Sequence, residues 1–187
     1  MNSSLVISKG SSRRSAYDLR SHHSDEDETH TLAVLVDNEA GVLARVIGLF
    51  SGRGYNIESL TVAEVDHERN LSRITIVTRG TPAVIEQIKA QLGRLVPVHD
   101  VHDLTVEGPS VERELALVKV KGVGDKRVEA MRTSEVFRAR VVDSTLESFT
   151  FELTGTPEKI DAFVDLMRPL GMTELARTGV AAMARGD

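Results

Sequence analysis

The feature that most constrains this fold is a short motif that occurs once in each half of the chain. Residues 80–82 and residues 155–157 both read Gly-Thr-Pro. Threonine is a good helix cap and proline suits the first helical turn, so each copy predicts the start of a helix. The match predicts an internal structural repeat, although convergent helix chemistry could produce so short a motif. Aligning the copies pairs apolar residues at helical spacing: Ile85 with Ile160, Ile88 with Phe163, Leu92 with Met167 and Leu95 with Leu170.

The first half of the chain reads as a β-α-β-β-α-β unit. Apolar residues alternate in its first strand, and the helix that follows is amphipathic and ends at Gly52 and Gly54. This order of elements is the split βαβ, or ferredoxin-like, plait. The predicted elements are a strand at residues 30–36, a turn at 37–41, a helix at 42–50, strands at 56–65 and 71–78, a second helix after residue 80 and a strand at 96–106.

The second half predicts the same order of elements. The fold class is therefore α+β, with two ferredoxin-like βαββαβ domains in tandem at residues 30–107 and 108–187. Residues 1–29 are serine-rich, then acidic, and lack periodicity, so we expect a disordered N-terminal extension. The predicted elements of the second half are strands at residues 115–120, 137–142 and 148–153, helices after residues 124 and 156, and a last strand at 172–183.

Composition excludes several classes of function. The formal net charge of -5 argues against a nucleic-acid partner, because binding to phosphate backbones depends on clustered lysine and arginine. The chain has no cysteine, which excludes disulfides and thiolate metal sites. It has no apolar run long enough for a membrane span, so we expect no membrane association and a cytoplasmic location.

Motifs for catalysis or metal binding are missing. The sequence contains no P-loop, no dinucleotide-binding glycine pattern and no Gly-x-Ser-x-Gly elbow. His99 and His102 stand three apart on a strand and point to opposite faces, which does not suit one metal. Glu112 and Glu114 flank Arg113 on a predicted strand face that we expect to be solvent-facing. We therefore predict no catalytic residue and no metal site on this chain.

Two other uses of the plait also lack their signatures. An RNA-recognition motif stacks bases on aromatic residues of its central strands. The central strands here, residues 32–35 and 73–77, contain no aromatic residue. Acylphosphatase-like hydrolases also have this fold, with an arginine in the loop after the first strand. The corresponding residues here, 37–41, contain no arginine. Neither an RNA-binding nor a hydrolase function is favoured.

The turn at residues 37–41 is the best candidate for a binding site. It precedes a helix whose first N–H groups have no intrahelical acceptor, and such an end attracts an anion, for example an amino-acid carboxylate. Asn38, Gly41 and Asn56 are also ordinary turn and strand-entry residues. Spacing alone leaves both interpretations open.

Longer stretches of sequence carry a family resemblance. Residues 38–46, Asn-Glu-Ala-Gly-Val-Leu-Ala-Arg-Val, and residues 48–62, Gly-Leu-Phe-Ser-Gly-Arg-Gly-Tyr-Asn-Ile-Glu-Ser-Leu-Thr-Val, closely resemble the small, regulatory subunit of acetohydroxyacid synthase, also called acetolactate synthase. The resemblance continues through residues 111–115 and 176–180, and so covers both predicted domains. Ala139 and Thr178 depart from the more usual glycine and serine.

The resemblance implies a function and a set of partners. The first domain would be an ACT domain that forms a homodimer edge to edge and binds a branched-chain amino acid, such as valine, between the two copies. The second domain would contact the large catalytic subunit, which carries thiamine diphosphate, magnesium and FAD, whereas this chain would hold no cofactor. The small subunit would activate that enzyme and confer feedback inhibition in valine, leucine and isoleucine synthesis, without being an enzyme by itself.

The resemblance also implies which residues bind the effector. The first four come from one protomer and the last two from its partner copy: Asn38, Gly41, the amides of Val42 and Leu43, Asn56 and Ile57. The alternative function is a free-standing ACT-type amino-acid sensor that acts on another enzyme or regulator.

Overall fold

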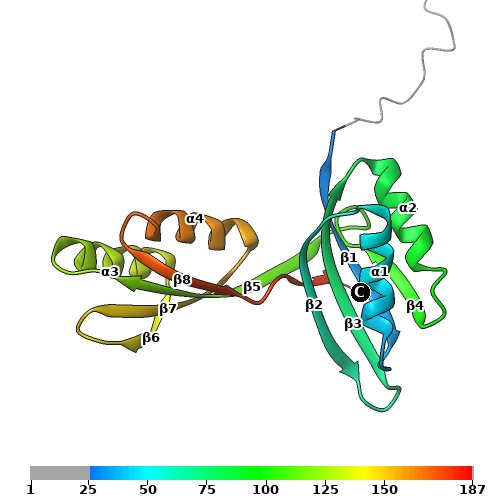
Figure 1. The fold of residues 1–187 in the computed structure, drawn as a ribbon, viewed down its shortest axis with the longest axis horizontal. Helices are drawn as coiled ribbons and strands as arrows, with labels where there is room; N and C mark the ends of the chain where they lie inside the picture. Colours follow the sequence, from blue (N-terminus) through cyan, green and yellow to red (C-terminus); the bar gives the residue numbers. More distant parts are fainter. Residues whose placement is uncertain (1–25, 187) are drawn as a thin grey trace, which may run out of the picture.

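The computed structural model describes residues 26–186, and these form two plaits joined by extended strands (Figure 1). The strand order is β2-β3-β1-β4 in the first sheet and β6-β7-β5-β8 in the second. These two orders are equivalent, with the first and third strands of each unit in the centre. The prediction of two ferredoxin-like βαββαβ units is therefore confirmed. Residues 1–25 of the expected N-terminal extension lie outside the described residues.

The first plait has helices on one face of its sheet only. Alternate residues of the central strands, among them Leu32, Val34 and Ile76, are fully buried against the two helices. Its open face is turned toward the second plait (Figure 1). Its elements are β1 (Glu28–Asp37), α1 (Val42–Arg53), β2 (Ile57–Asp66), β3 (Leu71–Gly80), α2 (Pro82–Leu92) and β4 (Val98–Asp103).

The second plait repeats this arrangement around Val118, Phe151 and Phe163. Its two helices lie side by side on one face of its sheet (Figure 1). Its elements are β5 (Ser110–Lys121), α3 (Asp125–Phe137), β6 (Arg140–Ser144), β7 (Ser148–Gly155), α4 (Pro157–Met167) and β8 (Met172–Arg177), and a short strand β9 (Ala181–Ala184) follows.

The repeated motif forms the same cap in both plaits. The hydroxyl of Thr81 accepts a hydrogen bond from the Val84 amide, and that of Thr156 accepts one from the Lys159 amide, both at 3.4 Å. A proline occupies the first turn of α2 and of α4. The aligned apolar residues at the first three positions are buried in both helices: Ile85, Ile88 and Leu92 in α2, and Ile160, Phe163 and Met167 in α4.

The last strand differs from the prediction. Residues 172–183 do not form one strand, because β8 ends at Arg177 and Gly179 adopts a left-handed φ of 84° before β9 begins at Ala181. After this break β9 pairs with residues 110–113 at the beginning of β5, off the β6-β7-β5-β8 path. Phe137 was also expected in a strand. It instead ends α3, and its ring packs 5.3 Å from that of Phe163.

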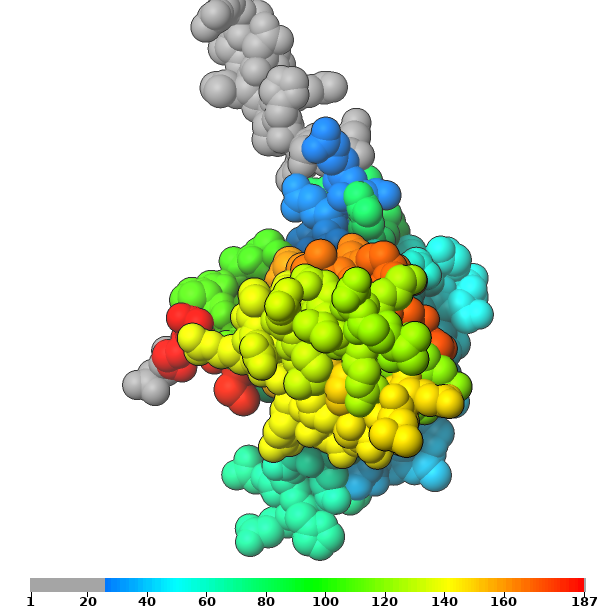
Figure 2. All heavy atoms as spheres, turned by 90° about the vertical axis from the view of Figure 1, so that its left-hand side faces the viewer, coloured from blue at the N-terminus to red at the C-terminus, as the bar shows by residue number. Residues whose placement is uncertain are grey.

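The residues after β8 form a strap across the open face of the first sheet. We define the strap as residues 178–184. The Val180 amide donates to the Ser59 hydroxyl at 2.9 Å, and the Thr61 hydroxyl donates to the Val180 carbonyl at 3.0 Å. β9 also contacts β1, and Ala33 and Thr75 are buried on the sheet face that the helices do not cover. Seen along the long axis, the second plait lies in front of the first, and the β2–β3 hairpin projects beyond it (Figure 2).

Candidate functional site

The turn between β1 and α1 is held by neighbouring segments. The Asp37 amide donates to the Pro97 carbonyl at 2.9 Å, and the Asn38 amide donates to the Asn70 carbonyl at 2.7 Å. The side-chain amide of Asn70 donates in return to the Asn38 carbonyl at 3.2 Å. His99 lies 2.6 Å from the Asp37 carboxylate. These bonds fix the backbone where the helix begins.

α1 begins at a glycine that leaves its N-terminus open. Gly41 is the N-cap with a left-handed φ of 89°, and within residues 26–186 nothing lies within 4 Å of where its Cβ would be. Among these residues, no side chain caps α1 and no acidic residue occupies its first turn. The Val42 amide makes a long bond of 3.4 Å to the Glu39 carbonyl. An open, uncapped helix start is a favourable place for a carboxylate.

Asn56 and Ile57 lie at the other end of the same helix. Gly54 ends α1 in a left-handed conformation, and the Thr78 hydroxyl donates to the Asn56 carbonyl at 2.6 Å. Because α1 has 12 residues, its two ends are about 18 Å apart. The structure thus groups Asn38, Gly41, Val42 and Leu43 at one end and separates them from Asn56 and Ile57. One chain does not bring all six residues into contact.

The edge of the first sheet at β2 combines free strand groups with apolar side chains. Within residues 26–186, β2 pairs with β3 on one side only. Val62 on this strand is 44% exposed, and on α1 Leu43 and Ile47 are 37% and 41% exposed. Leu43 and Ile47 stand four apart and therefore share one face of the helix. An unpaired strand beside exposed apolar residues is suited to pairing with another chain.

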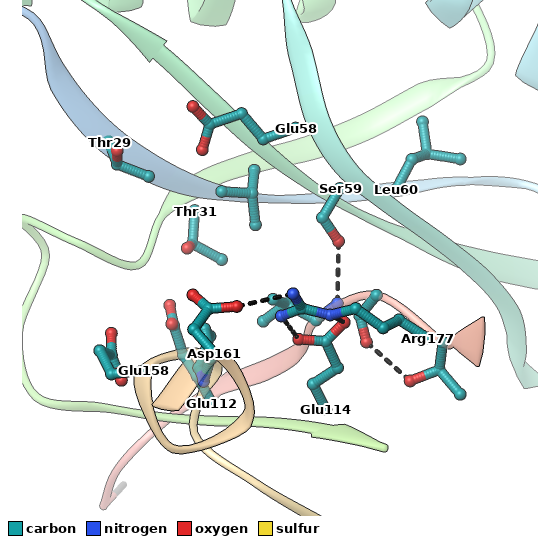
Figure 3. A pocket seen from close by; sticks show the side chains of 15 residues that line it. Thr29, Thr31, Glu58, Ser59, Leu60, Glu112, Glu114, Glu158, Asp161 and Arg177 are labelled. Carbon is teal, nitrogen blue, oxygen red and sulfur yellow. Dashed lines mark hydrogen bonds and ion pairs between the residues drawn. The ribbon is translucent and has the colours of Figure 1, made fainter. Parts of the chain in front are cut away.

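A cleft of about 540 Å³ lies between the two plaits (Figure 3). Its lining includes Thr29, Thr31 and β2 residues from the first plait, and the start of α4 and the end of β8 from the second. Of the residues that the structure describes, five acidic side chains and one basic side chain line it: Glu58, Glu112, Glu114, Glu158, Asp161 and Arg177. The cleft is therefore strongly acidic.

Arg177 joins three elements at the floor of this cleft. Its guanidinium contacts both carboxylate oxygens of Glu114, at 2.8 and 2.5 Å, and the Asp161 carboxylate at 2.6 Å (Figure 3). The hydrogen bonds that Arg177 donates to Glu114, together with the one it donates to Asp161, hold the pKa of Arg177 above its usual range. The expectation that Glu114 faces solvent is wrong, because Glu114 is only 5% exposed. It lies on the same face of β5 as buried Ala116 and Val118.

Sequence reasoning missed the cleft and the strap. Alternate residues of a strand face the same side, and this alternation along residues 114–120 places Glu114 on the buried face. The sequence therefore did contain a signal for the burial of Glu114. For the strap no local signal existed, because pairing of residues 181–184 with residues 110–113 is a long-range choice. Ser59 and Thr61 were read only as strand residues.

The histidines of β4 have separate partners. His99 contacts Asp37, whereas His102 contacts Asp100 and Glu107, each at 2.8 Å. The bond to Glu107, together with that to Asp100, raises the pKa of His102. Within residues 26–186 no group of three or more potential metal ligands comes together. None of the helices in this described part is long and apolar enough to cross a membrane.

Comparisons with known proteins match both plaits. A family model for the AHAS small subunit-like ACT domain matches residues 32–100, and one for the small subunit of acetolactate synthase matches residues 113–186. A probable acetolactate synthase small subunit of Archaeoglobus fulgidus is 51% identical over 158 residues, which are 84% of this chain and 98% of that protein.

Two further relatives extend this likeness. The small subunit of acetolactate synthase isozyme 3 from Salmonella typhimurium is 50% identical over 157 residues, covering 83% of this chain and 95% of that protein. The crystal structure of an acetolactate synthase small subunit from Thermotoga maritima has a TM-score of 0.77 and 38% identity, and covers 86% of this chain and 99% of that one.

Proposed function

Because the chain belongs to the acetolactate synthase small subunit family, with an ACT domain at its first plait, we propose that it regulates the catalytic subunit of that enzyme. It activates the large subunit and makes it sensitive to feedback inhibition by a branched-chain amino acid such as valine. The large subunit carries thiamine diphosphate, magnesium and FAD and performs the chemistry. This chain supplies the effector site.

The open start of α1 is the observation that carries the effector site. The amino-acid carboxylate binds the amides of Val42 and Leu43, where the helix dipole favours negative charge. The exposed Asn38 side chain accepts from the ammonium group. Gly41 leaves room for the ligand, since among the described residues nothing lies within 4 Å of where its Cβ would be. The Val42 amide exchanges its long bond to Glu39 for a bond to the ligand.

The effector site is completed by a second copy of the chain. Asn56 and Ile57 lie about 18 Å from the helix start in the same chain, so they serve the partner's site instead. Pairing of two ACT domains along β2 covers the exposed Val62, Leu43 and Ile47. The homodimer is thus part of the binding site, and a lone protomer holds only half of it.

Gly41→Asp in the holoenzyme reconstituted with the cognate large subunit tests this site. A new carboxylate close to that of the ligand repels it by about 4 kcal/mol at 4 Å and an effective dielectric of 20. We expect valine inhibition to disappear while activation of the large subunit remains. Acetolactate formation is measured with and without valine, and valine binding to the isolated small subunit by calorimetry.

Gly41→Asn is the matched control. Asparagine has the shape of aspartate, tolerates the left-handed conformation at φ 89° and carries no charge. We expect it to keep measurable valine inhibition. Normal inhibition in Gly41→Asp would refute the site, and equal loss in both variants would assign the effect to shape instead of charge.

A further inference from the structure

β2 carries two sets of contacts at adjacent positions. Ile57, its first residue, and Asn56, just before it, belong to the effector site proposed above. Ser59 and Thr61, next along the strand, hold the strap through Val180. We call Ser59, Thr61 and Val180 the clamp. Only one residue, Glu58, lies between the last effector position and the first clamp position.

A β-bulge lies between these two sets. The register of β2 against β3 shifts between Ile57 and Ser59, so that Glu58 has no pairing partner in the ladder. Ile57 packs against the helix-covered core, whereas Ser59 points to the strap on the opposite face. A bulge disrupts the ladder locally and re-aims the side chains beside it. A displacement of Ile57 on one face is therefore able to move Ser59 on the other.

Close packing at Gly179 shows how tightly the strap fits on β2. A Cβ at Gly179 would come within 2.7 Å of the Ser59 hydroxyl and 3.1 Å of a Thr61 methyl group. Gly179 also has a left-handed φ of 84°. Both features let the strap backbone lie directly on the strand. The strap therefore follows any movement of Ser59 closely.

The strap leads straight into the second plait. Arg177, three residues before Val180, is tied to Glu114 of β5 and Asp161 of α4. On the other side of Val180, β9 pairs with the beginning of β5. Both ends of the strap are thus fixed to β5, which is a central strand of the second sheet. A displacement of Val180 is therefore passed on to β5.

From these contacts we propose that the clamp transmits effector occupancy from the ACT domain to the second plait, and so to the catalytic subunit. The inference rests on the function proposed above and adds its route of regulation. Effector binding at Asn56 and Ile57 selects one arrangement of the bulge, and the clamp imposes that arrangement on the strap. Breaking the clamp uncouples valine binding from inhibition without removing the binding site.

Thr61→Val and Ser59→Ala, singly and together, test the clamp in the reconstituted holoenzyme. Each removes a hydrogen bond to Val180 and leaves the effector positions intact. We expect valine affinity of the isolated small subunit and assembly with the large subunit to stay within about twofold of wild type. Residual activity at saturating valine should rise about fivefold for each lost bond.

Two matched pairs separate the clamp from general loosening. Thr75→Val is the control for Thr61→Val, because Thr75 pairs with Thr61 across the sheet and makes no hydrogen bond to the strap among the described residues. Gly186→Ala is the control for Gly179→Ala, because Gly186 has a similar φ of 78° but open space around it. Of these four variants, only Thr61→Val and Gly179→Ala should uncouple inhibition from valine binding.

The outcomes distinguish the clamp from the proposed function. If the wild type binds valine and is inhibited, and the double variant assembles and is inhibited equally, the clamp is refuted and the proposed function stands. Equal uncoupling by Thr75→Val also refutes it. If the wild type neither binds nor responds to valine, leucine or isoleucine, the proposed function fails, and the clamp fails with it.

Discussion

At the scale of single residues, Arg177 holds several elements together through one side chain. It joins β8 to β5 and α4 through two carboxylates, one of which is buried. Buried ion pairs add little net stability, because desolvation offsets their attraction. Removing one partner is costly, however, since the other charge stays buried without compensation.

We therefore predict that Arg177→Ala lowers the free energy of unfolding by about 3 kcal/mol. Urea denaturation of the isolated small subunit measures the change. Arg168→Ala is the control, because Arg168 and its partner Asp165 are both well exposed and such surface pairs contribute less than about 1 kcal/mol. Similar losses in the two variants would show that the burial of Glu114 has no energetic consequence.

Individual residues also show where prediction from the sequence succeeds. Ile88 and Phe163 could be assigned to the core, because helical spacing and a clear cap fix which face is buried. Glu114 could not be assigned from its charge, since the partner that compensates its carboxylate, Arg177, lies 63 residues away. Residue type predicts only the average burial of a side chain, and a contact with a residue distant in the sequence can change that burial.

At the scale of elements, the equivalence of the two plaits is tested by comparing the N-caps of helices α2 and α4. Thr81 caps α2 and Thr156 caps α4 with the same geometry. Replacing a threonine cap by alanine leaves first-turn amides without an acceptor. The two sites should thus respond alike, although they lie in different plaits.

We predict that Thr81→Ala and Thr156→Ala each lower the free energy of unfolding by about 1 kcal/mol. Thr→Ser at each position retains the hydroxyl and should keep most of the stability. Thermal and urea unfolding, followed by circular dichroism, check both. A loss at only one position would contradict equivalent caps in the two plaits.

Elements with local signals were predicted, and those that depend on remote pairing were not. Both capped helices and both hairpins follow from spacing, caps and turns. β9 does not, because residues 181–184 become a strand only where residues 110–113 offer a free edge. The candidate effector turn was found from its glycine and its helix, whereas the clamp required knowing that Val180 returns to Ser59.

At the scale of the whole molecule, the proposed dimer determines whether the effector site exists. The exposed apolar residues at the β2 edge, Leu43, Ile47 and Val62, lose contact with water when two copies pair there. Ile47 is suited to a test because it is not one of the proposed effector positions. A charge at this position would be buried without a partner in the dimer.

Ile47→Glu should weaken dimerisation at least about tenfold and reduce valine binding with it. Sedimentation velocity over a range of protein concentrations measures the first, and calorimetry the second. Val136→Glu on α3 is the control, since Val136 is 79% exposed and lies in the second plait. Dimers of unchanged affinity in Ile47→Glu would place the interface elsewhere.

The return of the strap to the first plait has a consequence for synthesis on the ribosome. The bond between Ser59 and Val180 closes over 121 residues. Strands and helices of the first plait emerge and fold early, because domains form from the N-terminus onward. The face that carries Ala33 and Thr75 nevertheless waits for the strap, for several seconds at roughly 5–20 residues per second. The earliest part of the chain to fold is thus among the last to be finished.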